Sequence, residues 1–131
     1  PKQTLKLKPI GRPYNDGQRD IVLANNKMDD NLYVVDLSNK KVICQPSDIS
    51  DIYTDEIGSQ KIATAMTRKG ETYFIDTFNK KIFSGPFFNI REVFMTHRYQ
   101  NMVISQILNE DGSRFFINVL TGLRINPSEF Y

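Results

Sequence analysis

The stretch Lys69-Gly-Glu-Thr-Tyr-Phe-Ile-Asp-Thr-Phe-Asn-Lys-Lys-Ile-Phe83 contains two turns on either side of a run rich in aromatic and β-branched residues. This run, residues 72–77, is too short for a helix and is typical of a β-strand. The Asn79-Lys80 turn and the return run at residues 81–83 complete a β-hairpin. The stretch therefore predicts antiparallel β structure.

The same order of features occurs three times, with a period of about 40 residues. Each unit has a polar turn, a strand, a tighter turn, a return strand and a proline. The polar turns are 29–31, 69–71 and 111–113, the tighter turns are Asn39-Lys40, Asn79-Lys80 and Thr121-Gly122, and the prolines are Pro46, Pro86 and Pro127. We expect the Asn and Gly residues of the tighter turns to adopt positive φ. An apolar run precedes each hairpin, so each unit forms at least a three-stranded meander.

The connecting segments at residues 47–57 and 88–98 have apolar residues at helical spacing, but a twisted fourth strand has the same composition. We favour a fourth strand with a helical turn beside it. The third unit ends before such a segment, whereas the alternating residues 5–10 form an unpaired strand. We expect this strand to complete the third unit and close the sheet, which removes open edges. The prediction is one domain over 1–131, with a closing strand and turn at 1–18 and units at about 19–59, 60–100 and 101–131.

Three units of about 40 residues resemble a β-trefoil in number and length. Residues 69–83 are also similar to a unit of the WG-type bacterial repeats, which carry a lysine-glycine turn, an aromatic-Ile-Asp strand and a second turn. The resemblance covers about residues 19–131 as a pattern. The WG dipeptide and the Gln-x-Trp signature of sugar-binding trefoils are absent, because the chain has no tryptophan. Taken together, the repeat, the connecting segments and the closing strand predict an all-β fold with one or two short helical turns, in which a closed antiparallel sheet of three meander units is similar to a β-trefoil or a small barrel.

The composition excludes several classes of protein. The chain has 131 residues, and 17 basic against 15 acidic side chains give a net charge of +2, far below that of a dedicated duplex binder. One cysteine, Cys44, and one histidine, His97, exclude an internal disulfide and the usual zinc sites. No apolar stretch of about 18 residues and no signal-type segment is present, so we expect a soluble, cytoplasmic domain with no membrane partner.

No residues have the spacing of a catalytic site. His97 lacks a nucleophile motif, Cys44 is interpreted as a small core residue, and residues 11–17 lack the lysine and helix of a phosphate loop. The acidic residues of one connecting segment lack the glycine-turned loop of a cation site and are interpreted as a solvated face; they are Asp48, Asp51, Asp55 and Glu56. We therefore predict a protein that is not an enzyme, with no cofactor and no metal.

Asp36, Asp76 and Asn118 occupy matching positions directly before the tighter turns. Asp and Asn side chains accept hydrogen bonds from backbone N–H groups two residues further along. We expect these three residues to hold the turns rather than to take part in chemistry.

Charge is segregated along the chain. Residues 1–27 carry six basic and two acidic side chains, residues 28–59 carry two and seven, residues 60–100 carry seven and three, and residues 101–131 carry two and three. Separate charged patches are typical of proteins that dock to a macromolecule, although every surface must carry some charge.

Phe87 and Phe88 break the repeat, because the corresponding residues Ser47 and Asp48 are polar. If exposed, such an aromatic pair forms a binding hot spot. We predict a non-enzymatic recognition domain that binds a protein partner through Phe87, Phe88, Arg91, Arg98 and Tyr99. The abundance of Lys, Ile and Asn favours a phage or bacterial factor that acts on a host protein.

Two alternatives remain open. Single-stranded nucleic acid or RNA could bind through basic residues of two segments, namely Lys6, Lys8, Arg12, Lys80 and Lys81. The trefoil-like number of units also allows a carbohydrate-binding module. The sequence does not indicate an oligomeric state.

Overall fold

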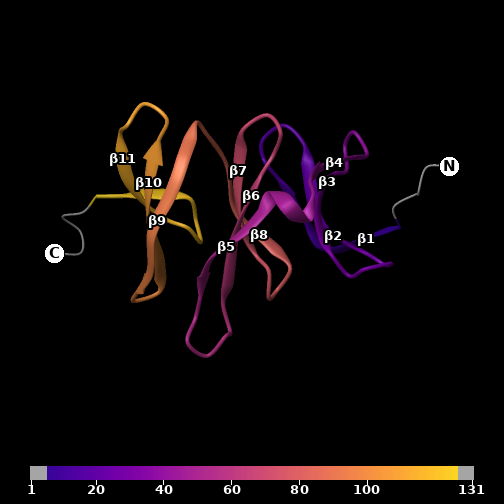
Figure 1. The fold of residues 1–131 in the computed structure, drawn as a ribbon, viewed down its shortest axis with the longest axis horizontal. Helices are drawn as coiled ribbons and strands as arrows, with labels where there is room; N and C mark the ends of the chain where they lie inside the picture. Colours follow the sequence, from indigo (N-terminus) through magenta and orange to yellow (C-terminus); the bar gives the residue numbers. More distant parts are fainter. Residues whose placement is uncertain (1–5, 127–131) are drawn as a thin grey trace.

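Short segments of alternating apolar and polar residues, separated by turns, form strands, and the chain is nearly all β (Figure 1). The computed structural model describes residues 6–126. The first sheet contains β1 (Leu7–Asn15), β2 (Asp20–Asn26), β3 (Leu32–Asp36) and β4 (Lys41–Cys44). The second contains β5 (Ile49–Thr54), β6 (Lys61–Met66), β7 (Glu71–Asp76) and β8 (Lys81–Phe88). The third contains β9 (Ile90–Tyr99), β10 (Met102–Asn109), β11 (Arg114–Asn118) and β12 (Leu123–Ile125). Over the described range, no helix is long and apolar enough to cross a membrane.

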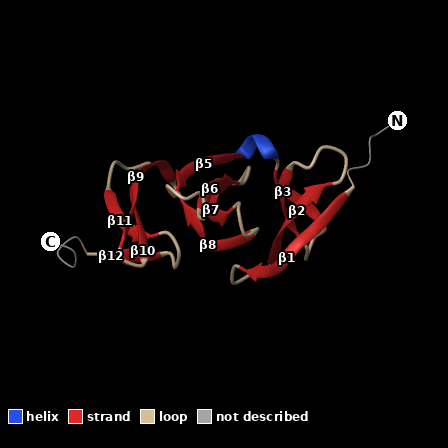
Figure 2. Cartoon of the chain, turned by 90° about the horizontal axis from the view of Figure 1, so that it is seen from below, coloured by secondary structure: helices blue, strands red, loops and turns tan. Residues whose placement is uncertain are grey.

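The three sheets are separate antiparallel meanders that follow one another along the long axis of the molecule (Figures 1 and 2). Within residues 6–126 the expected closure does not occur, since each of the three sheets is open. β1, which contains most of the predicted closing strand, pairs with β2 in the first sheet, because Leu7–Ile10 align with Leu23–Asn26 of its sequence neighbour. Of the residues used in the prediction, Leu5 and Pro127 lie outside the described range.

The two ambiguous connecting segments are strands. β5 and β9 each form the first strand of a new sheet, and the short 3-10 helix η1 (Pro46–Asp48) lies beside β5. The prediction of a strand with a helical turn beside it is therefore confirmed for the first segment. Each sheet begins one strand earlier than the predicted unit, since the segment expected to end a unit pairs with the strands that follow it.

The tighter turns are held by the aspartates that precede them. Asp36 Oδ1 accepts hydrogen bonds from two backbone N–H groups, and its Oδ2 accepts one from the Asn39 side chain at 2.8 Å; Asp76 and Asn79 repeat this arrangement. The expected role of these aspartates is confirmed. At the tighter turns of the first two sheets, positive φ falls on Lys40 and Lys80 rather than on the preceding asparagines, whereas Gly122 of the third turn has the expected positive φ.

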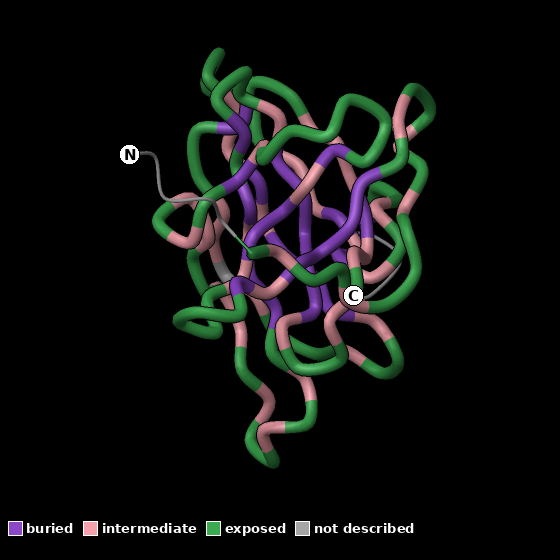
Figure 3. The backbone as a smooth tube through the Cα atoms, turned by 90° about the vertical axis from the view of Figure 1, so that its right-hand side faces the viewer, coloured by how far each residue is buried: buried purple, intermediate pink, exposed green. Residues whose placement is uncertain are grey.

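Two apolar clusters hold the sheets together, and the buried segments run through the middle of the molecule (Figure 3). Val34 and Phe74 stand at matching hairpin positions, and each packs toward the sheet that follows. Ile75 and Ile117 also occupy matching positions, one residue further along the strand. Ile75 packs toward the first sheet and Ile117 toward the second, so each faces the preceding sheet. Matching positions therefore face the same way in successive sheets.

The hairpin strands contribute side chains to the core to different extents. Phe74 and Ile117 are fully buried, whereas Phe83 and Phe116 are half-buried. Cys44 is buried in the first cluster, and burial raises the pKa of its thiol to about 12. This cysteine is a structural residue with no thiolate at neutral pH.

A polar cluster fastens the first sheet to the second. The Arg19 guanidinium donates to both carboxylate oxygens of Glu71 at 2.8 Å and to Asp16 at 3.1 Å, and the Tyr73 hydroxyl donates to Asp16 at 2.6 Å. The side chains of Arg19, Asp16 and Glu71 are only 15%, 3% and 12% exposed. Because these groups are largely removed from water, their mutual satisfaction fixes the relative position of the two sheets.

Candidate functional site

The structure separates the predicted protein-binding residues into two groups. Phe87 and Phe88 lie at the end of β8, and Arg91 is exposed near the start of β9. Arg98 and Tyr99 lie at the opposite end of β9, roughly 25 Å away at about 3.3 Å per residue. These residues therefore do not form one surface.

Arg98 has a structural partner. Its guanidinium donates to Asp55 at 3.4 Å and to the side chain of Gln60, both in the hairpin between β5 and β6. This hairpin projects from the second sheet (Figure 1). Arg98 thus supports the hairpin, and Tyr99 beside it is half-buried.

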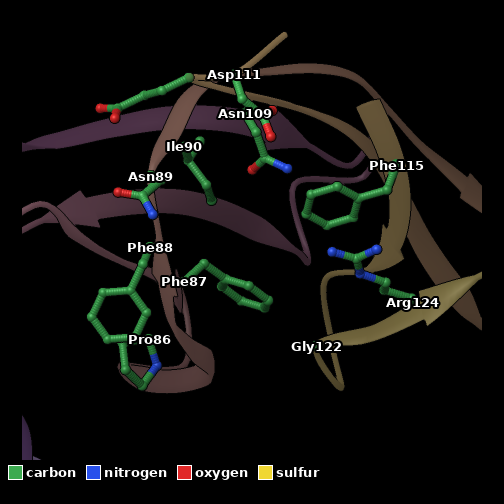
Figure 4. A pocket seen from close by; sticks show the side chains of 11 residues that line it. Pro86, Phe87, Phe88, Asn89, Ile90, Asn109, Asp111, Phe115, Gly122 and Arg124 are labelled. Atoms are coloured by element: carbon green, nitrogen blue, oxygen red, sulfur yellow. The ribbon is translucent and has the colours of Figure 1, made fainter. Parts of the chain in front are cut away.

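Phe87 and Phe88 border a cleft of about 570 Å³ between the second and third sheets (Figure 4). Residues 86–90, at the corner between β8 and β9, form one wall. Residues 109–111, at the turn between β10 and β11, form the second. The third wall contains Phe115, Gly122 and Arg124.

The two phenylalanines have different environments. The Phe87 ring meets the buried Phe74 ring edge-on, with centroids 5.3 Å apart, so Phe87 is anchored in the core and forms part of the floor. The Phe88 side chain is 59% exposed at the rim. Phe88 is therefore the residue of this pair that is available to a partner.

The cleft is held at both ends. The Ser84 hydroxyl donates to the Val119 carbonyl at 2.7 Å, and the Glu110 N–H donates to the Asn89 carbonyl at 2.8 Å. These bonds join β8 and its corner to two turns of the third sheet. The shape of the cleft is thus set without a ligand, which lowers the entropic cost of binding.

Gly122 allows the turn between β11 and β12 to lie close to β8. A Cβ atom at this position would lie 2.9 Å from the Ser84 Cβ and 3.3 Å from the Phe87 ring. The equivalent turn positions in the first two sheets are Lys40 and Lys80, which share its positive φ. A lysine at position 122 would therefore push the turn away from β8 and open the floor of the cleft.

Arg124 is the most unusual residue of the cleft. Arg124 lies in the return strand of the third sheet and pairs with Ile117 of the neighbouring strand. The equivalent pairs are Val42 with Val35 in the first sheet and Ile82 with Ile75 in the second. Arg124 therefore stands where the other two sheets have an apolar side chain. Its guanidinium carbon lies 4.0 Å from the centroid of the Phe115 ring, and the side chain points into the cleft (Figure 4).

Acidic side chains form one lip of the cleft. Glu110 and Asp111 are exposed at the turn between β10 and β11. Hydrogen bonds from the hydroxyl and the N–H of Ser113, at 2.6 and 2.9 Å, lower the pKa of Asp111. The cleft is therefore lined by both a basic and two acidic side chains.

The predicted nucleic-acid residues are partly brought together. A Cβ added to Gly11 of β1 would lie 2.8 Å from the Lys80 carbonyl, so the backbones at Arg12 and Lys80 are close neighbours. Lys81 lies over the Phe83 ring at 5.3 Å. The last two residues of the group, Lys6 and Lys8, are exposed near the start of β1, where the backbone of β1 reaches Asn26 and Lys27.

The cysteine and the histidine of the chain lie in different sheets. Cys44 is buried in the first sheet, whereas His97 is exposed in the third. No three His, Cys, Asp or Glu side chains within this range are grouped as a metal site. Among the acidic residues of the first connecting segment, Asp48 accepts a hydrogen bond from the Gln45 N–H at 2.8 Å, and Asp55 accepts one from the Ile57 N–H at 3.0 Å.

Sequence reasoning found Phe87 and Phe88 but missed Arg124. The signal was available, since a charged residue interrupts a return strand that is apolar at the same position in the other two units. Phe115 could not be identified from the sequence, because the packing of one sheet against the next decides which strand residues line a cleft. The trefoil and WG-repeat resemblances stay predictions, since comparison with protein-family models, curated proteins and solved structures finds no match to this chain.

Proposed function

We propose that this chain is a non-enzymatic recognition domain that binds a segment of a protein partner in the cleft between its second and third sheets. The proposal rests on one observation above all. A preformed cleft of about 570 Å³ presents an exposed phenylalanine, Phe88, and an arginine, Arg124, at a position that is apolar in the other sheets.

The composition of the cleft favours a protein partner. Aromatic and arginine side chains carry much of the binding energy in protein interfaces, usually beside a polar rim. Here Phe88 and Arg124 are such side chains, and Glu110, Asp111 and Asn89 supply the rim. A phage or bacterial factor that acts on a host protein is a biological role consistent with this proposal.

The first test uses Phe88→Ser with Phe78→Ser as the matched control. Phe78 is 56% exposed in the turn between β7 and β8, so both substitutions remove a similar exposed ring. Random twelve-residue peptides displayed on phage are selected against the immobilised domain, and their affinities are measured by fluorescence polarisation. We expect Phe88→Ser to weaken binding about tenfold or more, as at an interface hot spot, and Phe78→Ser to leave it unchanged.

Equal binding by the wild type and both variants would contradict the proposed site. A greater effect of Phe78→Ser would move the site to the turn between β7 and β8. Thermal unfolding of each variant checks that the domain is folded.

A second candidate function is binding of single-stranded nucleic acid or RNA, and the closeness of Arg12 to Lys80 supports it. Affinity that depends on phosphate contacts falls steeply as salt rises. If this function is correct, a labelled oligo(U) strand binds at 50 mM salt, weakens at least about tenfold by 200 mM, and is lost in the Lys80→Glu/Lys81→Glu variant. Absence of binding at 50 mM salt would dismiss this candidate and leave the cleft proposal unaffected.

A further inference from the structure

Arg124 identifies the chemistry of the partner segment, and the inference rests on the proposed function of the cleft. We propose that the cleft recognises a protein segment in which one acidic side chain lies next to a bulky apolar side chain, with the carboxylate paired to Arg124.

The guanidinium is placed to receive a carboxylate. No salt bridge to Arg124 forms within residues 6–126, whereas Arg19 and Arg98 both have carboxylate partners there. Stacking on Phe115 at 4.0 Å restricts the orientation of the guanidinium plane. An arginine held in one orientation loses little entropy when it forms two parallel hydrogen bonds to a carboxylate.

Apolar surface lies directly beside this cation. Phe87, Phe115 and Ile90 line the same cleft, and Figure 4 shows the Phe87 and Phe115 rings on either side of the space that the guanidinium enters. A ligand that pairs with Arg124 therefore places its neighbouring group against aromatic carbon. A bulky apolar side chain next to the acidic one gains from that burial, whereas a polar neighbour does not.

The acidic lip limits the number of negative charges on the ligand. Glu110 and Asp111 line the same cleft as Arg124, and hydrogen bonds from Ser113 lower the pKa of the Asp111 carboxyl. A chain of phosphates that follows the cleft would meet these two carboxylates and be repelled. A protein segment with a single carboxylate at the Arg124 end avoids this repulsion.

Charge reversal tests the inference. The peptide selection is repeated with Arg124→Glu, and Arg114→Glu is the matched control. Arg114 also lies over a phenylalanine, Phe94, at 5.6 Å, but it belongs to the other face of the third sheet because Arg114 and Phe115 are consecutive in β11. Wild type and Arg114→Glu are expected to select peptides with Asp or Glu next to Phe, Leu, Ile, Met or Tyr.

On Arg124→Glu, the selected peptides should instead carry Lys or Arg at that place. The affinity of an acidic peptide selected on the wild type should fall about tenfold or more on Arg124→Glu and on the milder Arg124→Gln. If wild type and Arg124→Glu select the same peptides and Phe88→Ser still weakens their binding about tenfold or more, the inference is wrong and the cleft function stands. If Phe88→Ser has no effect on any selected peptide, the proposed function itself is wrong.

Discussion

Replacement of Arg19 by methionine is expected to lower the free energy of unfolding by about 3 kcal/mol. Arg19 is the cation shared by Asp16 and Glu71 at the junction of the first two sheets, with N–O distances of 3.1 and 2.8 Å. Methionine keeps much of the volume but leaves both carboxylates without a cation in a largely buried place. Urea denaturation followed by tyrosine fluorescence or circular dichroism gives the difference.

The pH dependence of the difference in unfolding free energy between the wild type and Arg19→Met is a second readout. Burial would raise the pKa of Asp16, but hydrogen bonds from Tyr73, from two backbone N–H groups and from Arg19 lower it to about 2. A carboxyl group with a lowered pKa in the folded state contributes stability above its unfolded pKa of about 3.8, and that stability is lost as the pH falls toward 2. We therefore expect the free energy of unfolding of the wild type to fall between pH 4 and pH 2. The difference in this free energy between the wild type and Arg19→Met should become smaller over the same range.

Arg98→Met is the matched control. It also removes an arginine–carboxylate pair, but the Arg98 side chain is 40% exposed and its contact to Asp55 is 3.4 Å. An exposed pair of this kind contributes less than about 1 kcal/mol. Equal losses for Arg19→Met and Arg98→Met would contradict the assignment of Arg19 as the junction between the first two sheets.

Gly85→Ala is expected to destabilise the domain by about 3 kcal/mol, from backbone strain and overpacking together. Gly85 has φ +135, and an added Cβ would lie 2.9 Å from the Thr72 carbonyl and 2.6 Å from the Tyr73 ring. The ring cannot move away at low cost, because its hydroxyl is bonded to Asp16 at 2.6 Å. Thermal and urea unfolding of the purified variant measure the effect.

Gly112→Ala separates the two causes. Gly112 has φ +89, but nothing lies within 4 Å of its added Cβ. This variant carries conformational strain alone and should lose only about 1 kcal/mol. Equal stability of Gly85→Ala and Gly112→Ala, or a higher stability of Gly85→Ala, would contradict the close approach of β8 to β7 at Gly85.

The local structure could be predicted because it depends on neighbouring residues. The Asp36 and Asp76 turns follow from side-chain hydrogen bonds to N–H groups two and three residues away. Closure of the sheet could not be predicted, because it depended on whether residues 5–10 would pair with β2 or with a strand about 100 residues away in sequence. The local pairing occurs, in keeping with its lower loop-closure entropy.

The candidate site could be predicted only in part, because a local sequence pattern marks some of its residues and long-range packing brings in the others. Phe88 could be recognised as a break in a repeated pattern, and its exposure of 59% supports that interpretation. Arg98 and Tyr99 are close to Arg91 in the sequence, but an extended strand carries them to the far end of β9. Arg124 joins Phe88 only because the second and third sheets pack face to face, which no local pattern specifies.

Binding of a protein segment between the second and third sheets can be located residue by residue with an NMR titration. A peptide selected on the wild type is added to the ¹⁵N-labelled domain, and the backbone amide shifts are followed. We predict that the largest shifts occur at residues 87–90, 109–113 and 122–124, with little change in β1 to β4. Shifts concentrated at residues 6–12 and 80–81, or none at the cleft residues while the peptide binds, would contradict the account.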